Sequence, residues 1–111
     1  MKLKLPKVVK VLGKKYTVTV AEVLVKENGA EQLINKAMIY AGHHNSKDCT
    51  IVIDAEQGKE QAKDTLVHEM LHAYDYAMQL DLSELQVHRL AVAVTAMLAD
   101  NPEVVKFLIS K

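Results

Sequence analysis

The spacing of hydrophobic and polar residues changes half-way along this 111-residue chain, from the period of a strand to the period of a helix. Residues 8–12 are mostly apolar, residues 16–20 alternate between polar and apolar, and Gly13 begins the short connection between them. Alternation around a glycine-containing turn is typical of a β-hairpin, which we predict within residues 8–25. Residues 50–53 form another β-rich run and are predicted to be a further strand.

Residues 30–41 carry two competing patterns. Apolar side chains recur there at helical spacing, whereas residues 38–42 also suit a strand that pairs with the one just described. Both interpretations stay open at this point. His43 and His44 follow within residues 42–48, which we predict to be a solvent-exposed loop.

The second half of the chain predicts three helices. Residues 59–80 form one long segment with helical periodicity. Ser83 is a suitable N-cap for the next helix, because Gln86 three residues later completes a capping box. That helix is expected to run to about residue 99, and Asn101 followed by a proline starts a short last helix. The middle helix is apolar nearly all round, so we predict that it is buried.

The motif that carries chemistry is His68-Glu69-Met70-Leu71-His72, an HExxH sequence within the first of these helices. Side chains four residues apart lie on one helical face, so both imidazoles can reach one metal ion. Zn²⁺ suits them because it accepts nitrogen ligands at about 2.0–2.1 Å. Glu69 then lies beside the metal, where its carboxylate can accept a proton from a reacting water. The motif therefore predicts a zinc site with Glu69 as general base.

Chance does not explain the motif well, because the composition of the chain gives roughly 0.02 accidental matches. The polar side of residues 61–80 also gathers Asp64, Asp75 and Tyr76 without a Lys or Arg, unlike a solvated face that mixes both signs. We interpret Asp75 as a partner for the outer ring nitrogen of a ligand histidine, with Asp64 as an alternative. Tyr76 is a candidate hydrogen-bond donor to an oxyanion, or a partly buried helix tyrosine.

A catalytic zinc ion needs a third protein ligand and an open position. The short turn at residues 81–83 makes the next helix an antiparallel neighbour, so its first residues lie near the HExxH motif. Glu84 and His88 share one stripe of that helix, and a carboxylate buried there needs a partner that a metal can supply. Glu84 is the predicted third ligand, although an exposed acid at a helix N-terminus is another interpretation. His88 is the alternative ligand, or else a donor to the oxyanion.

Residues 65–73 followed by residues 83–91 resemble the ImmA/IrrE-type metallopeptidases, particularly the short versions encoded in phages and prophages. In that group a Glu on the downstream helix, in the pattern E-x-E-A-x-x-F-A, is the third ligand. The resemblance covers about residues 36–101, favours a strand just before the loop, and implies a small sheet packed on the active-site helix. The chain departs from the pattern at Gln86, which replaces the second acid. The implied roles are Zn²⁺ ligation by His68, His72 and Glu84, and proton transfer by Glu69.

Composition bears on partners and compartment. The net charge is zero, but residues 1–15 carry six lysines and no acid, which leaves eight basic and fourteen acidic side chains, a net of −6, in residues 16–111. We interpret the lysines as protection of an edge strand rather than a nucleic-acid contact, since no arginine accompanies them. The sequence contains no bilayer-spanning apolar run, and its one cysteine cannot form an internal disulfide. From the composition of the first residues we expect no secretory leader. We therefore expect a cytoplasmic protein.

These features predict a single α+β domain over residues 1–111, in which a small antiparallel sheet packs on the HExxH helix and a buried helix completes the zinc site. The predicted function is zinc-dependent hydrolysis of peptide bonds in a protein or peptide substrate. Glu69 is the base in this hypothesis, and His88 or Tyr76 stabilises the oxyanion. The alternative is a non-catalytic, zinc-stabilised module for phage–host interaction or regulation. No membrane or nucleic-acid partner is expected, and the oligomeric state stays open.

Overall fold

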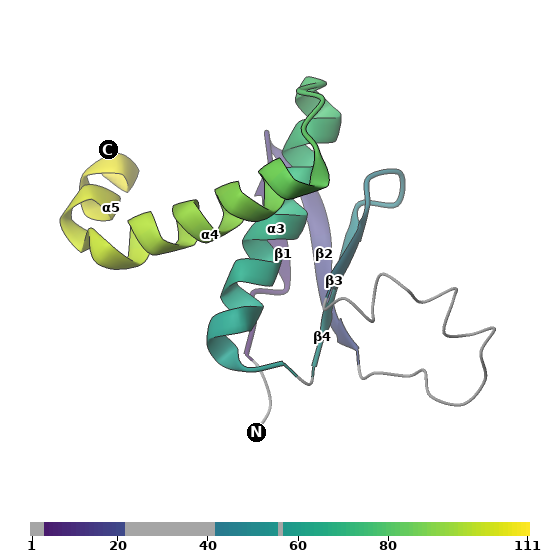
Figure 1. The fold of residues 1–111 in the computed structure, drawn as a ribbon, viewed down its shortest axis with the longest axis horizontal. Coiled ribbons are helices and arrows are strands. Elements are labelled where there is room, and N and C mark those ends of the chain that lie inside the picture. Colours follow the sequence, from purple (N-terminus) through teal and green to yellow (C-terminus); the bar gives the residue numbers. More distant parts are fainter. Residues whose placement is uncertain (1–3, 22–41, 56) are drawn as a thin grey trace.

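The computed structural model describes residues 4–21, 42–55 and 57–111, and these form the predicted α+β architecture of a small sheet followed by three helices (Figure 1). The strands are β1 (Val8–Val11), β2 (Lys14–Ala21), β3 (Gly42–Asn45) and β4 (Thr50–Asp54). The helices are α3 (Lys59–Met78), α4 (Glu84–Asp100) and α5 (Pro102–Ile109). The competing predictions for residues 30–41 fall outside the described residues.

The predicted hairpin is confirmed by the antiparallel pairing of β1 with β2. Leu12 and Gly13 connect the two strands with positive φ angles of 52° and 85°. A two-residue turn with both φ angles positive matches the right-handed twist of paired strands, and glycine adopts such an angle without steric cost. β1 is an outer strand of the described sheet, where Lys10 is exposed, in line with the interpretation of the lysines as edge protection.

The prediction of an antiparallel sheet is wrong, because the sheet is mixed. Its order is β1-β2-β4-β3, and β2 runs parallel to β4 with Val18 opposite Ile51. Hairpin signals specify only strands that are neighbours in sequence, whereas a parallel pair needs a long connection, which here spans residues 22–49. β3 pairs antiparallel with β4, so His43 and His44 lie in a strand and not in the predicted loop.

One face of the sheet forms the core with α3. β4 alternates between partly buried and fully buried residues, and Ile51 and Ile53 are the fully buried ones. They cluster with Tyr16 and Val18 of β2 and with Ala73 of α3. Because side chains alternate along β4, Ile51 and Ile53 point to the same face of the sheet and pack against Ala73. The small side chain of Ala73 lets α3 approach the sheet closely.

Helix α4 crosses α3 on the side away from the sheet (Figure 1). Val87 and Ala91 are its buried residues, and among the described elements it packs only on α3 and α5. The prediction that this helix is buried is therefore wrong: most of its apolar side chains remain exposed. An apolar composition indicates that a helix gains from burial, but it does not supply a second layer to cover it.

The predicted start of α4 is confirmed. Ser83 Oγ accepts a hydrogen bond of 3.1 Å from the Gln86 backbone N–H, and Gln86 Oε1 accepts one of 2.8 Å from the Ser83 N–H. These two bonds form the capping box. Pro102 occupies the first turn of α5, as predicted. None of the described helices combines the length and the apolar character that a membrane span requires.

Candidate metal centre

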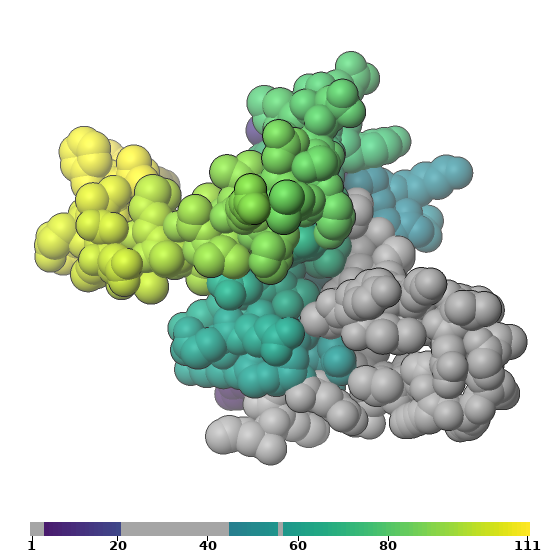
Figure 2. Space-filling view, viewed as in Figure 1, coloured from purple at the N-terminus to yellow at the C-terminus, as the bar shows by residue number. Residues whose placement is uncertain are grey.

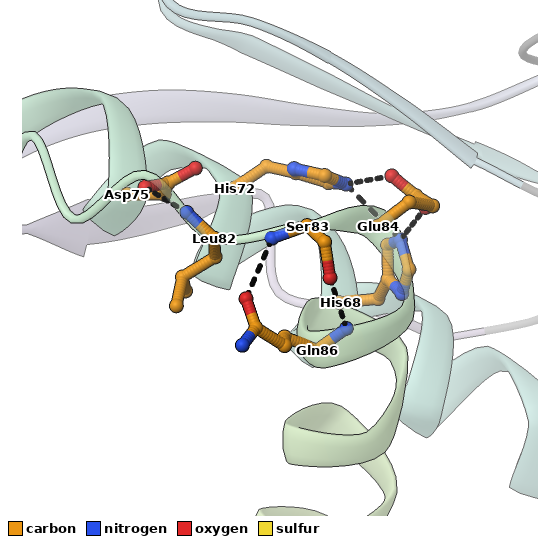
Figure 3. Close-up of polar contacts among 7 residues, drawn as sticks. All are labelled: His68, His72, Asp75, Leu82, Ser83, Glu84 and Gln86. Carbon is orange, nitrogen blue, oxygen red and sulfur yellow. Dashed lines mark hydrogen bonds and ion pairs between the residues drawn. The ribbon is translucent and has the colours of Figure 1, made fainter.

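Three of the predicted side chains converge between α3 and α4 (Figure 3). His68 Nε2 lies 2.8 Å from Glu84 Oε2, and His72 Nε2 lies 3.0 Å from Glu84 Oε1. The two Nε2 atoms are 3.2 Å apart. The potential ligand atoms of the three residues all lie within 4.8 Å of one another. The fold thus brings Glu84 to the two histidines of the HExxH motif.

The placement of the three residues follows from local structure. His68 and His72 are one turn apart on α3, so their imidazoles project from the same face. Glu84 is the first residue of α4, directly after the N-cap Ser83. The capping box fixes the backbone at that point, and with it the position from which the Glu84 side chain reaches the histidines.

Asp75 has a different role from the one predicted. Its Oδ1 accepts a hydrogen bond of 3.2 Å from the backbone N–H of Leu82, so the interpretation of Asp75 as a partner of a histidine ring is wrong (Figure 3). Its backbone carbonyl also accepts from the Leu80 N–H at 3.2 Å. Gln79 and Asp81 have positive φ angles of 54° and 61° within the same turn. Asp75 therefore holds the tight connection that precedes Glu84.

The three residues lie close enough together to share a zinc ion. Tetrahedral zinc with nitrogen ligands at about 2.0–2.1 Å implies a ligand–ligand distance of about 3.3 Å. The two histidine Nε2 atoms are 3.2 Å apart, and each lies 2.8 or 3.0 Å from a different oxygen of Glu84. Without an ion, His68 and His72 can each donate to Glu84, but their two N–H groups then face one another at 3.2 Å. A cation that accepts a lone pair from each residue removes this conflict.

The electrostatics of the site also favour a cation. Glu84 is largely exposed, and an exposed ion pair contributes at most about 1 kcal/mol, so pairing alone gives the cluster little stability. Glu69 adds a second carboxylate within the same turn of α3, and it is only 6% exposed. It is one of the buried residues of α3, together with Thr65 and with Ala73, which packs against the sheet. Glu69 is thus shielded from bulk water while being adjacent in sequence to a ligand histidine.

His88 and Tyr76 lie one turn beyond the cluster. The ring centroid of His88 is 6.2 Å from that of His68, and His88 is not among the three residues whose ligand atoms converge. This geometry favours Glu84 over His88 as the third ligand. Tyr76 is exposed, one helical turn after His72. No hydrogen bond joins Asp64 to either ligand histidine in the described part of the chain.

The sequence did not predict the side-chain hydrogen bonds of Gln57, which join α3 to the end of β4. Gln57 Nε2 donates a hydrogen bond of 3.0 Å to the Asp54 carbonyl at the end of β4. Thr65 Oγ1 donates one of 2.9 Å to Gln57 Oε1. The N-cap of α3 is Gly58, which has no side chain to cap the helix, so Gln57 fixes the start of the helix instead. Thr65 is buried, but its burial is visible only in the structure.

Comparison of the chain with protein-family models, with curated proteins and with solved structures found no match. The arguments for function therefore rest on the geometry and chemistry of the site.

Proposed function

We propose that this protein is a zinc-dependent peptidase in which His68, His72 and Glu84 hold the metal. The observation that carries the proposal is the convergence of ligand atoms from these three residues on a helix in which the buried Glu69 directly follows His68 in sequence. Two histidines and one glutamate form a donor set of catalytic zinc, because three protein ligands leave one coordination position for water or substrate. The resemblance to short phage and prophage metallopeptidases supports the same function. We propose that the protein acts in the cytoplasm.

A zinc ion held there would lower the pKa of a bound water to about 7 and polarise a substrate carbonyl. The Glu69 carboxylate accepts the proton of the attacking water and then donates it to the departing amine nitrogen. Its burial keeps competing bulk water away from that proton transfer. His88 or Tyr76, each exposed and one helical turn after a residue of the cluster, donates a hydrogen bond to the oxygen on which negative charge develops.

The proposed substrate is a protein or peptide segment in an extended conformation. β3 packs against α3 and is the last strand of the described sheet. An extended peptide that pairs with such a strand gains main-chain hydrogen bonds, which depend little on sequence. This arrangement would bring a scissile carbonyl alongside the helix that carries the histidines.

The proposal is tested by measuring zinc content and peptide cleavage on the same preparations. The parent protein, Glu69→Gln and Glu60→Gln are each loaded with zinc and incubated with a proteome-derived peptide library, and new termini are identified by mass spectrometry. Glu60 is a matched control because it is an exposed glutamate on the same helix. We expect all three proteins to bind zinc, and Glu69→Gln to cleave at least about 100-fold more slowly than the others. Undiminished cleavage by Glu69→Gln contradicts the assignment of the base.

The second candidate function is a zinc-stabilised interaction or regulatory module without catalysis. It is favoured by the extent of apolar surface that α4 and α5 leave exposed, which is more than a small enzyme needs. A parent protein that binds one zinc ion and becomes more stable, yet cleaves nothing in the library, supports this function over the peptidase.

A further inference from the structure

The last two helices form an arm that extends from the body of the protein (Figures 1 and 2). We define the α4–α5 arm as residues 92–109, the part that follows the last buried residue of α4. Apolar side chains cover much of it, and α5 has no buried residue at all. The exposed apolar residues at its far end are Met97, Leu98, Val104, Phe107, Leu108 and Ile109.

The apolar area of the arm exceeds what a monomer normally leaves in water. Seven large apolar side chains of the arm are between 39% and 77% exposed, which leaves on the order of 700 Å² of apolar surface. The largest apolar patch of a typical monomer is about 300–600 Å². A stable interface of standard size buries roughly 800 Å² on each partner. The exposed apolar surface of the arm is thus of the size that one protein partner covers.

The charges of the arm favour a second copy of this chain as that partner. Residues 92–109 contain two acidic side chains and one basic one, a net of only −1 per copy, so little charge repulsion opposes the meeting of two copies. Glu103 and Lys106 lie on the same short helix, where antiparallel packing of two copies places each near the opposite charge of the other. The arm has no excess of Lys or Arg, which an anionic membrane surface or a nucleic acid would require.

We propose that two copies of this protein associate through their α4–α5 arms in a twofold-symmetric dimer. Each arm covers the apolar residues that the other leaves exposed, and the zinc cluster at the first turn of α4 stays outside the contact. This inference goes beyond the proposed function, because it depends on neither zinc nor catalysis.

The test is analytical ultracentrifugation of the full chain from about 1 to about 100 μM. Phe107→Glu and Leu108→Glu place a charge in the proposed contact. Leu12→Glu is the control, because Leu12 in the β1–β2 turn and Leu108 are both 62% exposed. Circular dichroism and zinc content verify that each variant is folded.

We expect the parent to dimerise with a Kd in the micromolar range or below. Each arm variant is expected to raise that Kd at least about tenfold, because a carboxylate in an apolar contact is costly, and Leu12→Glu to leave it within about twofold. A parent protein that is monomeric at the highest concentration overturns the proposal. This holds also if the monomeric protein binds lipid vesicles through its arm. A dimer that survives both arm substitutions, or one that Leu12→Glu disrupts equally, overturns it as well.

Discussion

The carboxylate of Asp75 accepts a hydrogen bond of 3.2 Å from the backbone N–H of Leu82, seven residues further along the chain. This bond crosses the turn between the helix that carries both histidines and the helix that begins with Glu84. The turn also contains two non-glycine residues with positive φ, which cost free energy unless the surrounding structure holds them. Asp75 therefore positions the third donor of the cluster without touching it.

Removing this acceptor is expected to weaken zinc binding. Asp75→Ala leaves the Leu82 N–H without its partner, and a loss of about 1–3 kcal/mol in turn stability corresponds to a zinc Kd raised about tenfold or more. Asp75→Asn keeps an oxygen acceptor at the same place and is expected to bind zinc nearly as well as the parent. Competition with a chromophoric chelator measures all three affinities. If the Asn variant is as weak as the Ala variant, the negative charge and not the hydrogen bond is what matters.

The choice between Glu84 and His88 as third ligand is decided by zinc stoichiometry. Glu84→Ala removes a donor atom that lies 2.8 Å from His68 Nε2, so this variant is expected to lose zinc during dialysis against a weak chelator. His88→Ala is expected to retain one zinc ion per chain, because His88 lies outside the converging group. Elemental analysis of the dialysed proteins gives the answer. The opposite pattern, with zinc lost only from His88→Ala, would show that the predicted ligand is wrong.

The donor cluster was accessible from sequence because it depends on local geometry. Helical spacing places His68 and His72 together, and the short connection of residues 79–83 between the helices brings Glu84 back to them. The role of Asp75 was not accessible in the same way. A carboxylate seven residues after His68 suits a histidine partner on a straight helix, but the helix ends at Met78, and the N–H groups of the turn compete for it. The hydrogen-bond donor that reaches Asp75 therefore depends on the residue at which the helix ends.

The sequence was sufficient to predict most helices and strands, but not how the strands pair or which helices are covered. The hairpin and the starts of α4 and α5 follow from turn, capping and proline residues a few positions apart. The parallel pairing of β2 with β4 depends on residues far apart in sequence, which no local pattern specifies. The exposure of α4 has a similar cause, because its apolar residues do not indicate whether the same chain or another one covers them.

Zinc is expected to raise the thermal stability of the protein. A ligand that binds only the folded state at about 1,000 times its Kd adds about 4 kcal/mol, which for a domain of this size raises Tm by more than about 10 °C. Differential scanning calorimetry with and without zinc measures the shift, and a strong chelator should reverse it. His72→Ala is the control and should show little shift. An equal shift in that variant would show that the stabilising zinc binds outside this cluster.

Gln79→Gly is expected to stabilise the protein. Gln79 ends α3 with a φ of 54°, and its backbone N–H donates to the Asp75 carbonyl, an arrangement in which glycine avoids the steric cost of a side chain. Relief of that cost should raise the free energy of unfolding by about 0.5–1 kcal/mol and Tm by a few degrees. Ala77→Gly, two residues earlier on the exposed side of the same helix, should lower it by up to about 1 kcal/mol. Urea unfolding monitored by circular dichroism measures both changes. If the two substitutions destabilise equally, the left-handed residue is not a source of strain, and the turn before Glu84 is held more tightly than its backbone angles indicate.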